Sequence, residues 1–239
     1  MLELRNVSYR VENEGVEKYI LKDISLTIED RFVAITGPNG GGKSTLAKVL
    51  AGIIQPTSGQ ILFDGEDITN LSVTERAKKG ISFAFQQPVR FKGIKVLDLI
   101  RLAAGENMSA AGACAYLSKV GLCARDYINR DVDGSLSGGE LKRIEIAISL
   151  ARSAPLSIFD EPEAGIDLWS FKNLIQVFED MKKELQGSIL IISHQERILN
   201  IADEIVVIAG GEVKAQGKKE EILPELLGAE DQAGCRFYQ

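Results

Sequence analysis

Residues 37–45 read Gly37-Pro38-Asn39-Gly40-Gly41-Gly42-Lys43-Ser44-Thr45, which fits the phosphate-loop pattern G-x-x-x-x-G-K-S/T. The apolar run 32–36 precedes this stretch, and a helical pattern at 46–50 follows it. The glycines let backbone N–H groups point toward phosphate oxygens, and the N-terminus of the helix adds a partial positive charge. We therefore expect residues 37–45 to hold nucleotide phosphates, with Lys43 at the β- and γ-phosphates and the Ser44 hydroxyl on Mg²⁺.

The composition restricts the class of protein. The chain has 239 residues, of which 45% are hydrophobic, and a formal net charge of −6. This length suits one large α/β domain, or a core with a subdomain, and the acidic balance without a basic block argues against a nucleic-acid partner. No apolar run approaches the roughly 20 residues of a membrane span, and the first residues do not resemble a signal peptide. Three cysteines without a disulfide or metal spacing are typical of a reduced, cytoplasmic protein.

The hydrophobic pattern predicts two kinds of sheet. Residues 2–9 and 24–28 alternate polar and apolar, which indicates antiparallel strands. The runs at 81–85, 156–160 and 188–193 are apolar without alternation, as expected for a parallel sheet covered by helices on both faces. Further strands are expected at 60–67 and in a hairpin over 204–215, and helical patterns dominate from about 88 to 150 and recur between 174 and 185.

Two further motifs follow the phosphate loop. Asp160-Glu161 ends an apolar strand, where one carboxylate can hold the Mg²⁺ shell through water and the next can polarise the water that attacks a γ-phosphate. Taken alone, this pair also fits a solvated strand end. The second motif, Leu136-Ser137-Gly138-Gly139-Glu140, lies before it in the chain. With both motifs in this order, residues 2–217 resemble the ATP-binding-cassette (ABC) family, whose signature is L-S-G-G-Q/E.

The resemblance implies an α/β fold, namely the ABC ATPase fold. Its P-loop, RecA-like core would carry a mostly parallel sheet, an N-terminal antiparallel β subdomain and an inserted helical subdomain. The ATPase domain would span 1–217, with the core at about 1–87 and 152–217 and the helical subdomain at about 88–151. Residues 218–239 would form a C-terminal tail, with a short helix and a loose end.

The resemblance also implies a head-to-tail dimer, in which the P-loop of one copy and the signature of a second copy enclose ATP and Mg²⁺. In that arrangement Ser137, Gly138, Gly139 and Glu140 act in trans, because the start of their helix suits a γ-phosphate. Glu161 matches the general base, and His194 matches the switch histidine that contacts the γ-phosphate. Gln86 matches the glutamine that meets Mg²⁺ and the attacking water, and Asp167 matches the loop aspartate that crosses the dimer interface.

The adenine contact departs from the family pattern. Many members carry an aromatic residue after the first strand, and the closest alignment places Val11 there. Tyr9 lies two positions earlier and shares a face with Val11 if the strand is regular. Tyr9 could stack on the base or be an ordinary tyrosine of the sheet, so apolar contact with adenine at Val11 is the expectation.

The partner is indicated by three short stretches that resemble SufC, the ATPase family of iron–sulfur cluster assembly. Residues 84–94 resemble A-F-Q-x-P-V-x-x-x-G-V/I, residues 138–143 resemble G-G-E-x-K-R, and residues 194–200 resemble H-x-x-R-I/L-L-N. Three features depart from that family. They are the loop Ala164-Gly165-Ile166-Asp167, the pair Pro162-Glu163 after the catalytic glutamate, and the shorter length between residues 93 and 135.

The SufC resemblance implies a SufB- or SufD-like scaffold as partner, on which ATP hydrolysis would act during cluster assembly. The alternative is the ATPase subunit of a membrane transporter, with a permease as partner. A DNA-repair or chromosome-type cassette is disfavoured, because no long coiled coil or zinc module separates the motifs. Cys235 could be an exposed thiol, although an incidental cysteine is the simpler interpretation.

Overall fold

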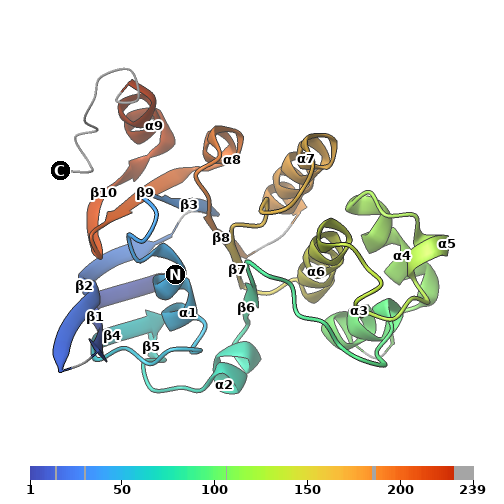
Figure 1. The fold of residues 1–239 in the computed structure, drawn as a ribbon, viewed down its shortest axis with the longest axis horizontal. Coiled ribbons are helices and arrows are strands. Elements are labelled where there is room, and N and C mark those ends of the chain that lie inside the picture. The colour runs from blue at the N-terminus through green and yellow to red at the C-terminus, as the bar shows by residue number, and fades with distance from the viewer. Residues whose placement is uncertain (14, 30, 106, 185–186, 229–239) are drawn as a thin grey trace. The chain divides into compact units, whose positions relative to one another are not determined.

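The computed structural model describes residues 1–13, 15–29, 31–105, 107–184 and 187–228 (Figure 1). The chain divides into two compact units. The first unit contains Met1–Ile81 and Ser188–Gln239, and the second contains Ser82–Gly187. The second unit is wider than the helical subdomain expected at about 88–151, because it also includes two strands and a long helix.

The first unit begins with an antiparallel sheet in the order β2-β1-β4-β5 (Figure 1). In the second half of β2 buried residues alternate with exposed ones, which is the pattern of a strand with one face on the core. The antiparallel sheet predicted at the N-terminus is confirmed. Its strands are β1 (Leu2–Asn13), β2 (Val16–Ile28), β4 (Ser58–Phe63) and β5 (Glu66–Asp67).

The second sheet of this unit has the order β10-β9-β3-β8. Strand β3 pairs in parallel with both β8 and β9, whereas β10 pairs antiparallel with β9. All five residues of β3 are buried, which explains why the sequence runs apolar without alternation. The bounds are β3 (Phe32–Thr36), β8 (Ser188–Ile192), β9 (Glu204–Ala209) and β10 (Glu212–Lys218).

In the described part of the first unit, four helices accompany these sheets: α1 (Lys43–Leu50), α2 (Val73–Lys78), α8 (Glu196–Ile201) and α9 (Lys219–Gly228). Helix α1 directly follows the phosphate loop, as predicted, and α9 is the helix expected in the tail. The loose end expected after it, with Cys235, lies outside the described residues. Helices α2 and α8, which have six residues each, were not predicted from the sequence.

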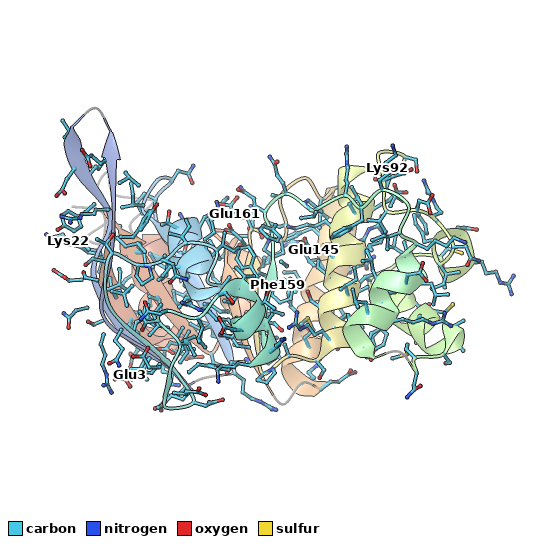
Figure 2. The ribbon with its side chains drawn as sticks, turned by 90° about the horizontal axis from the view of Figure 1, so that it is seen from below. Glu3, Lys22, Lys92, Glu145, Phe159 and Glu161 are labelled. Atoms are coloured by element: carbon cyan, nitrogen blue, oxygen red, sulfur yellow. The ribbon has the colours of Figure 1, made fainter. Side chains whose placement is uncertain are left out.

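The second unit holds the neighbouring strands β6 (Ile81–Ala84) and β7 (Leu156–Asp160) with the helices that follow them. Phe159 on β7, labelled in Figure 2, packs edge to face on Phe178 of α7 with 5.1 Å between ring centroids. The helices are α3 (Val96–Ala104), α4 (Ala110–Lys119), α5 (Ala124–Tyr127), α6 (Gly138–Arg152) and α7 (Leu168–Glu184). Among the described residues, no helix is long and apolar enough to cross a membrane.

Candidate active site

The phosphate loop turns sharply between β3 and α1, and its glycines are required by close backbone neighbours. Gly37 has a φ of 137°, and a Cβ at this position would lie 2.0 Å from the Ile208 carbonyl oxygen. Gly42, the N-cap of α1, has a φ of 105°, and its Cβ would lie 2.8 Å from the Ile20 carbonyl oxygen. Only glycine fits these two positions.

Lys43 is the first residue of α1, and its side chain is buried in the loop. Its ammonium group donates hydrogen bonds to the carbonyl oxygens of Gly37 and Pro38, at 2.8 Å each. The loop is closed further by the Gly41 N–H, which donates to the Pro38 carbonyl at 3.1 Å. The cation therefore lies within the same short segment whose N–H groups begin the helix.

His194 lies at the same edge of the sheet as the phosphate loop. Ile35 of β3 pairs with Ile192 of β8, and the strands are parallel, so the residues after both strands meet at their carboxyl ends. The Ser193 N–H donates to the Ile35 carbonyl at 3.1 Å, and the exposed His194 follows directly. The first unit thus brings the predicted loop residues and the predicted switch histidine together.

Tyr9 and Val11 belong to β1 and are both half-buried, while Arg10 and Glu12 beside them are exposed. The pairing of β1 with β2 is irregular on both sides of Tyr9. At each irregularity the extra, unpaired residue belongs to β2, so successive side chains of β1 still alternate between the two faces of the sheet. Tyr9 and Val11 therefore share a face, and either side chain could supply the apolar contact expected for adenine.

The second unit joins Gln86 and Glu161. The Gln86 Nε2 donates to the Glu161 Oε2 at 2.6 Å, although the two residues are 75 positions apart in the chain. Glu161 follows β7 and has a φ of 45°, in the left-handed region that is costly for a residue with a Cβ. Backbone strain of this kind is found most often at functional sites, where the surrounding structure keeps the residue in the unfavourable conformation. Asp160, one residue earlier, is 2% exposed.

The signature residues start helix α6. The Ser137 Oγ accepts a hydrogen bond from the Glu140 N–H, and the Glu140 carboxylate accepts one from the Ser137 N–H, which together form a capping box. The Tyr127 hydroxyl also donates to Glu140. This hydrogen bond and the Ser137 N–H lower the pKa of Glu140 to about 2, so the residue is a carboxylate at neutral pH.

The loop after Glu161 lies against the signature. A Cβ on Gly139 would be 3.7 Å from the Gly165 carbonyl oxygen, so the two glycine-containing segments are neighbours. The Asp167 Oδ1 accepts a hydrogen bond from the Ser170 N–H at 3.0 Å, which caps the start of α7. The predicted site residues are therefore divided between the units. The phosphate loop, Val11 and His194 lie in the first, and Gln86, Asp160, Glu161, Asp167 and residues 137–140 lie in the second.

The residues expected to hold Mg²⁺ all carry oxygen atoms: Ser44 in the first unit, and Gln86 and Asp160 in the second. Mg²⁺ prefers oxygen ligands and is usually bound by one or two protein groups plus substrate phosphates and water. The described residues contain no group of three or more His, Cys, Asp or Glu side chains that could hold a metal ion. Gln86 donates through its Nε2 to Glu161, and the Oε1 of the same amide is an acceptor of the kind that can bind a cation.

Two buried charged residues of α6 were missed by the sequence analysis. Lys142 is 1% exposed, and its ammonium donates to the carbonyl oxygens of Phe85 and Gln86. Glu145 accepts a hydrogen bond from the Phe85 N–H at 2.9 Å. A signal was present, since Glu145 lies four positions after Leu141 and three before Ile148, on the predicted apolar face.

An apolar pocket of about 520 Å³ lies within the second unit beside these residues. Its walls come from β6 and the segment after it, from α3 and from α6. Val89, Phe91 and Leu102 line this pocket and are exposed by 45%, 39% and 80%, so exposed apolar side chains are grouped here rather than scattered singly. The pocket is lined by Phe83, Phe85, Pro88, Val89, Phe91, Leu99, Leu102, Ala103, Val132, Leu141, Ile144, Glu145, Ile148 and Arg152.

Comparison with known proteins gives sequence relatives of similar length. A family model described as ABC transporter matches residues 21–164. An uncharacterized ABC transporter ATP-binding protein of Methanocaldococcus jannaschii is 42% identical over 212 residues, which cover 85% of this chain and 84% of that protein. A probable ATP-dependent transporter of Cyanophora paradoxa, ycf16, is 34% identical over 236 residues, which cover 92% of this chain and 89% of the relative.

Solved structures of cassette proteins share the fold. The dimeric structure of MJ0796, a bacterial ABC transporter cassette, has a TM-score of 0.82 at 26% identity and covers 92% of this chain and 99% of that chain. A post-hydrolysis state of the same cassette, bound to ADP and Pi, has a TM-score of 0.79 at 27% identity, with the same coverage. The predicted α/β fold class is confirmed by these similarities.

Proposed function

Because the chain belongs to the ABC transporter family of ATP-binding proteins, we propose that it is the ATPase subunit of a SUF-type iron–sulfur cluster assembly complex. Since the chain belongs to this family, it is an ATP hydrolase, and a related cassette has been solved in a post-hydrolysis state bound to ADP and Pi. The scaffold on which it acts is the proposed part. The observation that carries the proposal is that residues 84–94, which resemble the SufC family, supply several walls of the apolar pocket.

Glu161 would act as the general base for ATP hydrolysis. Its carboxylate would take a proton from a water molecule as the water oxygen attacks the γ-phosphorus, and the bond to the β-phosphate oxygen would break to give ADP and phosphate. The hydrogen bond from the Gln86 Nε2 at 2.6 Å holds this carboxylate in one orientation.

The phosphate loop would bind the β- and γ-phosphates through its N–H groups and the Lys43 ammonium. Lys43 now donates to two carbonyl oxygens of the loop, so it lies close to the phosphates that the loop would surround. Ser44 and Gln86, with Asp160 through water, are the groups that would hold Mg²⁺. Bound with ATP, this ion supplies positive charge against the phosphate oxygens. His194, at the same sheet edge as the loop, would contact the γ-phosphate.

A second copy of the chain would complete each ATP site. The free N–H groups at the start of α6 suit an anion, and the capping box fixes the Ser137 hydroxyl at that end. In a head-to-tail dimer these donors would face the γ-phosphate bound by the partner copy, with Asp167 at the interface. ATP would then stabilise the dimer, and its hydrolysis would loosen it.

The scaffold would bind the apolar pocket of the second unit. Exposed apolar side chains clustered around a pocket are typical of a protein interaction site. Arg90 and Lys92 are exposed between Val89, Phe91 and Gly93 (Lys92 is labelled in Figure 2). We therefore expect a scaffold segment with apolar side chains for the pocket and carboxylates for these two cations. The protein would work in the cytoplasm, in line with its composition.

The second candidate is the ATP-binding subunit of a membrane transporter. The names of the two sequence relatives described above favour it, since each is called a transporter or a transporter component. The chemistry at Gln86 and Glu161 is the same under both candidates. They differ in what occupies the pocket, which is a soluble scaffold in the first case and a permease in the second.

Isolation of the tagged chain from its native cells under anaerobic conditions separates these candidates, with the bound protein identified by mass spectrometry. A soluble β-helical scaffold that raises ATP turnover when purified and added back is the expected result. A polytopic membrane protein would contradict the proposal and favour the transporter. Phe91→Glu should abolish the association, whereas Val16→Glu on β2, where Val16 is 68% exposed, should retain it and serves as the matched control.

A further inference from the structure

Glu145 connects the apolar pocket to the backbone that carries Gln86. Its side chain lies on α6 and lines the pocket (Figure 2 labels Glu145 and Glu161). The Oε1 accepts the Phe85 N–H at 2.9 Å, and the Oε2 lies 3.4 Å from the Lys142 ammonium. Only 17% of the side chain is exposed. A carboxylate in such surroundings is costly to bury, and its contacts with the Phe85 N–H and the Lys142 ammonium offset that cost.

The peptide held by Glu145 is directly followed by the residue that holds the catalytic carboxylate. Phe85 precedes Gln86, and Gln86 donates to Glu161 at 2.6 Å. The same stretch is also held by Lys142 of α6, which donates to the carbonyl oxygens of Phe85 and Gln86. The phenyl ring of Phe85 packs edge to face on Phe83, with 4.8 Å between centroids, and both rings line the pocket.

We infer that Glu145 is a positioning residue for ATP hydrolysis, which fixes Gln86 and through it the Glu161 carboxylate from the wall of the apolar pocket. Among the described residues, Glu145 is hydrogen-bonded to Phe85 and paired with Lys142, and it has no hydrogen bond to Glu161. Its effect passes through the hydrogen bond to the backbone at Phe85, and the Lys142 ammonium, 3.4 Å from its Oε2, contacts the same stretch. A partner bound in the pocket would contact Glu145 and Phe85 together, so the same hydrogen bond links partner binding to the rate of hydrolysis.

Three substitutions separate this hydrogen bond from the charge of Glu145. Glu145→Gln removes the charge but keeps an oxygen that can accept the Phe85 N–H. Glu145→Asp keeps the charge but is one methylene shorter, so it cannot span the same distance without a backbone shift. Glu145→Leu is similar in size and suits an apolar wall, but it removes the oxygen that accepts the Phe85 N–H. If the aspartate variant does not fold, the leucine variant still tests the loss of this hydrogen bond.

Steady-state ATP hydrolysis by the full chain gives the primary result. We expect kcat to fall by about tenfold to a hundredfold in the Asp and Leu variants, with KM for ATP changed by less than about threefold, as when a supporting contact of a catalytic group is lost. The Gln variant should stay within about threefold of the wild type in both constants. The control is Glu184→Gln on α7, which removes a surface carboxylate paired with Lys119 and should leave both constants unchanged.

A double-mutant cycle with Gln86→Ala tests the route through Gln86. In the Gln86→Ala background, Glu145→Leu should cost little further activity, because the group that it positions is already absent. Equal losses in both backgrounds, or a Gln variant as slow as the Asp variant, would overturn the inference.

The inference rests on the proposed roles of Gln86 and Glu161. Failure of those roles and failure of the inference alone would give different kinetic results. Unchanged turnover in Gln86→Ala would contradict the proposed site and this inference with it. Slow turnover in Gln86→Ala beside full turnover in Glu145→Leu would contradict the inference alone. The outcome of these tests does not depend on the identity of the partner, because every rate is measured on the isolated chain.

Discussion

Two carboxylates of the second unit differ in how they are held, and this difference matches the roles proposed for them. Glu161 accepts a hydrogen bond from the Gln86 side chain, and its backbone lies in the left-handed region at φ 45°. Glu140 instead accepts hydrogen bonds from the Tyr127 hydroxyl and the Ser137 N–H, which keep it ionised and fixed. A general base needs capacity to accept a proton, whereas a capping carboxylate does not. The geometry therefore favours Glu161 as the base and Glu140 as a structural anion.

Glu161→Gln should bind ATP but hydrolyse it slowly. The amide keeps the size of the side chain but cannot take a proton from water, so we expect kcat to fall by about a hundredfold or more. Nucleotide binding by calorimetry and phosphate release under single-turnover conditions would measure the two effects separately. Turnover near the wild-type rate would remove Glu161 from the role of base. The surface variant Glu184→Gln again provides the control.

Tyr127→Phe should lower stability in a way that depends on pH. The Tyr127 hydroxyl is the largest cause that lowers the pKa of Glu140 from 4.5 to about 2. Because the pKa is lower in the folded state, the stabilisation is present above pH 4.5 and is lost as the pH falls toward 2. The difference in melting temperature between wild type and variant should therefore be larger at pH 6 than at about pH 2.5.

Thermal melts at several pH values measure this difference. Tyr116→Phe on α4 removes the same hydroxyl at another site of the second unit and serves as the control. A Tyr127→Phe difference that stays constant across the pH range would contradict the assignment of this hydrogen bond to the stability of the signature.

At the scale of the elements, the end of the phosphate-loop helix is held by a buried arginine of α2. Arg76 is 0% exposed. Its guanidinium donates to the carbonyl oxygens of Val49 and Leu50 at the end of α1, at 2.6 and 2.9 Å. It also donates to the carbonyl oxygens of Thr69 and Leu71, at 2.7 and 3.2 Å. The last carbonyl groups of a helix lack partners within it, so Arg76 satisfies groups that would otherwise be buried without one.

Arg76→Met should destabilise the first unit. The substitution keeps most of the side-chain volume but removes the donors, and buried carbonyl groups left unsatisfied should cost about 2–4 kcal/mol of unfolding free energy. Urea denaturation measures the change. Lys79→Met at the end of the same helix breaks the surface ion pair with Glu66 and should cost less than about 1 kcal/mol. Equal effects of the two variants would contradict the capping role of Arg76.

The elements that the sequence predicted are those with a strong period or a defined loop chemistry. The antiparallel alternation of β1 and β2 and the strand before the phosphate loop are confirmed. Helix α2 was not predicted because six residues are too few to show a helical period, although the Ser72–Glu75 capping box was a local signal. Lys142 and Glu145 were missed because charged residues on a helix are usually exposed, and only tertiary packing on the Phe85 backbone makes their burial favourable. The same holds for the Gln86–Glu161 contact, which joins residues 75 positions apart.

At the scale of the whole molecule, the predicted site residues are divided between two compact units and, by the proposal, between two copies of the chain. The phosphate loop and His194 belong to one unit, and the signature and Glu161 belong to the other. In the proposed dimer a nucleotide would be bound by the loop of one copy and by residues 137–140 of the other. Hydrolysis would then require association, so turnover should rise with protein concentration.

Complementation between two inactive variants tests this arrangement. Lys43→Ala should impair every phosphate loop. Gly138→Asp should place a negative charge at every signature, where it would repel the γ-phosphate. Each variant alone should therefore be nearly inactive. A Cβ on Gly138 would meet no atom within 4 Å, so the aspartate should fit without disturbing the fold. In an equal mixture, half of the dimers should be mixed, and each mixed dimer should hold one intact site made from the loop of one chain and the signature of the other. If each site works independently, ATP hydrolysis should then recover to about a quarter of the wild-type rate. If loop and signature acted within the same chain, every site in the mixture would still carry one lesion and no activity would return.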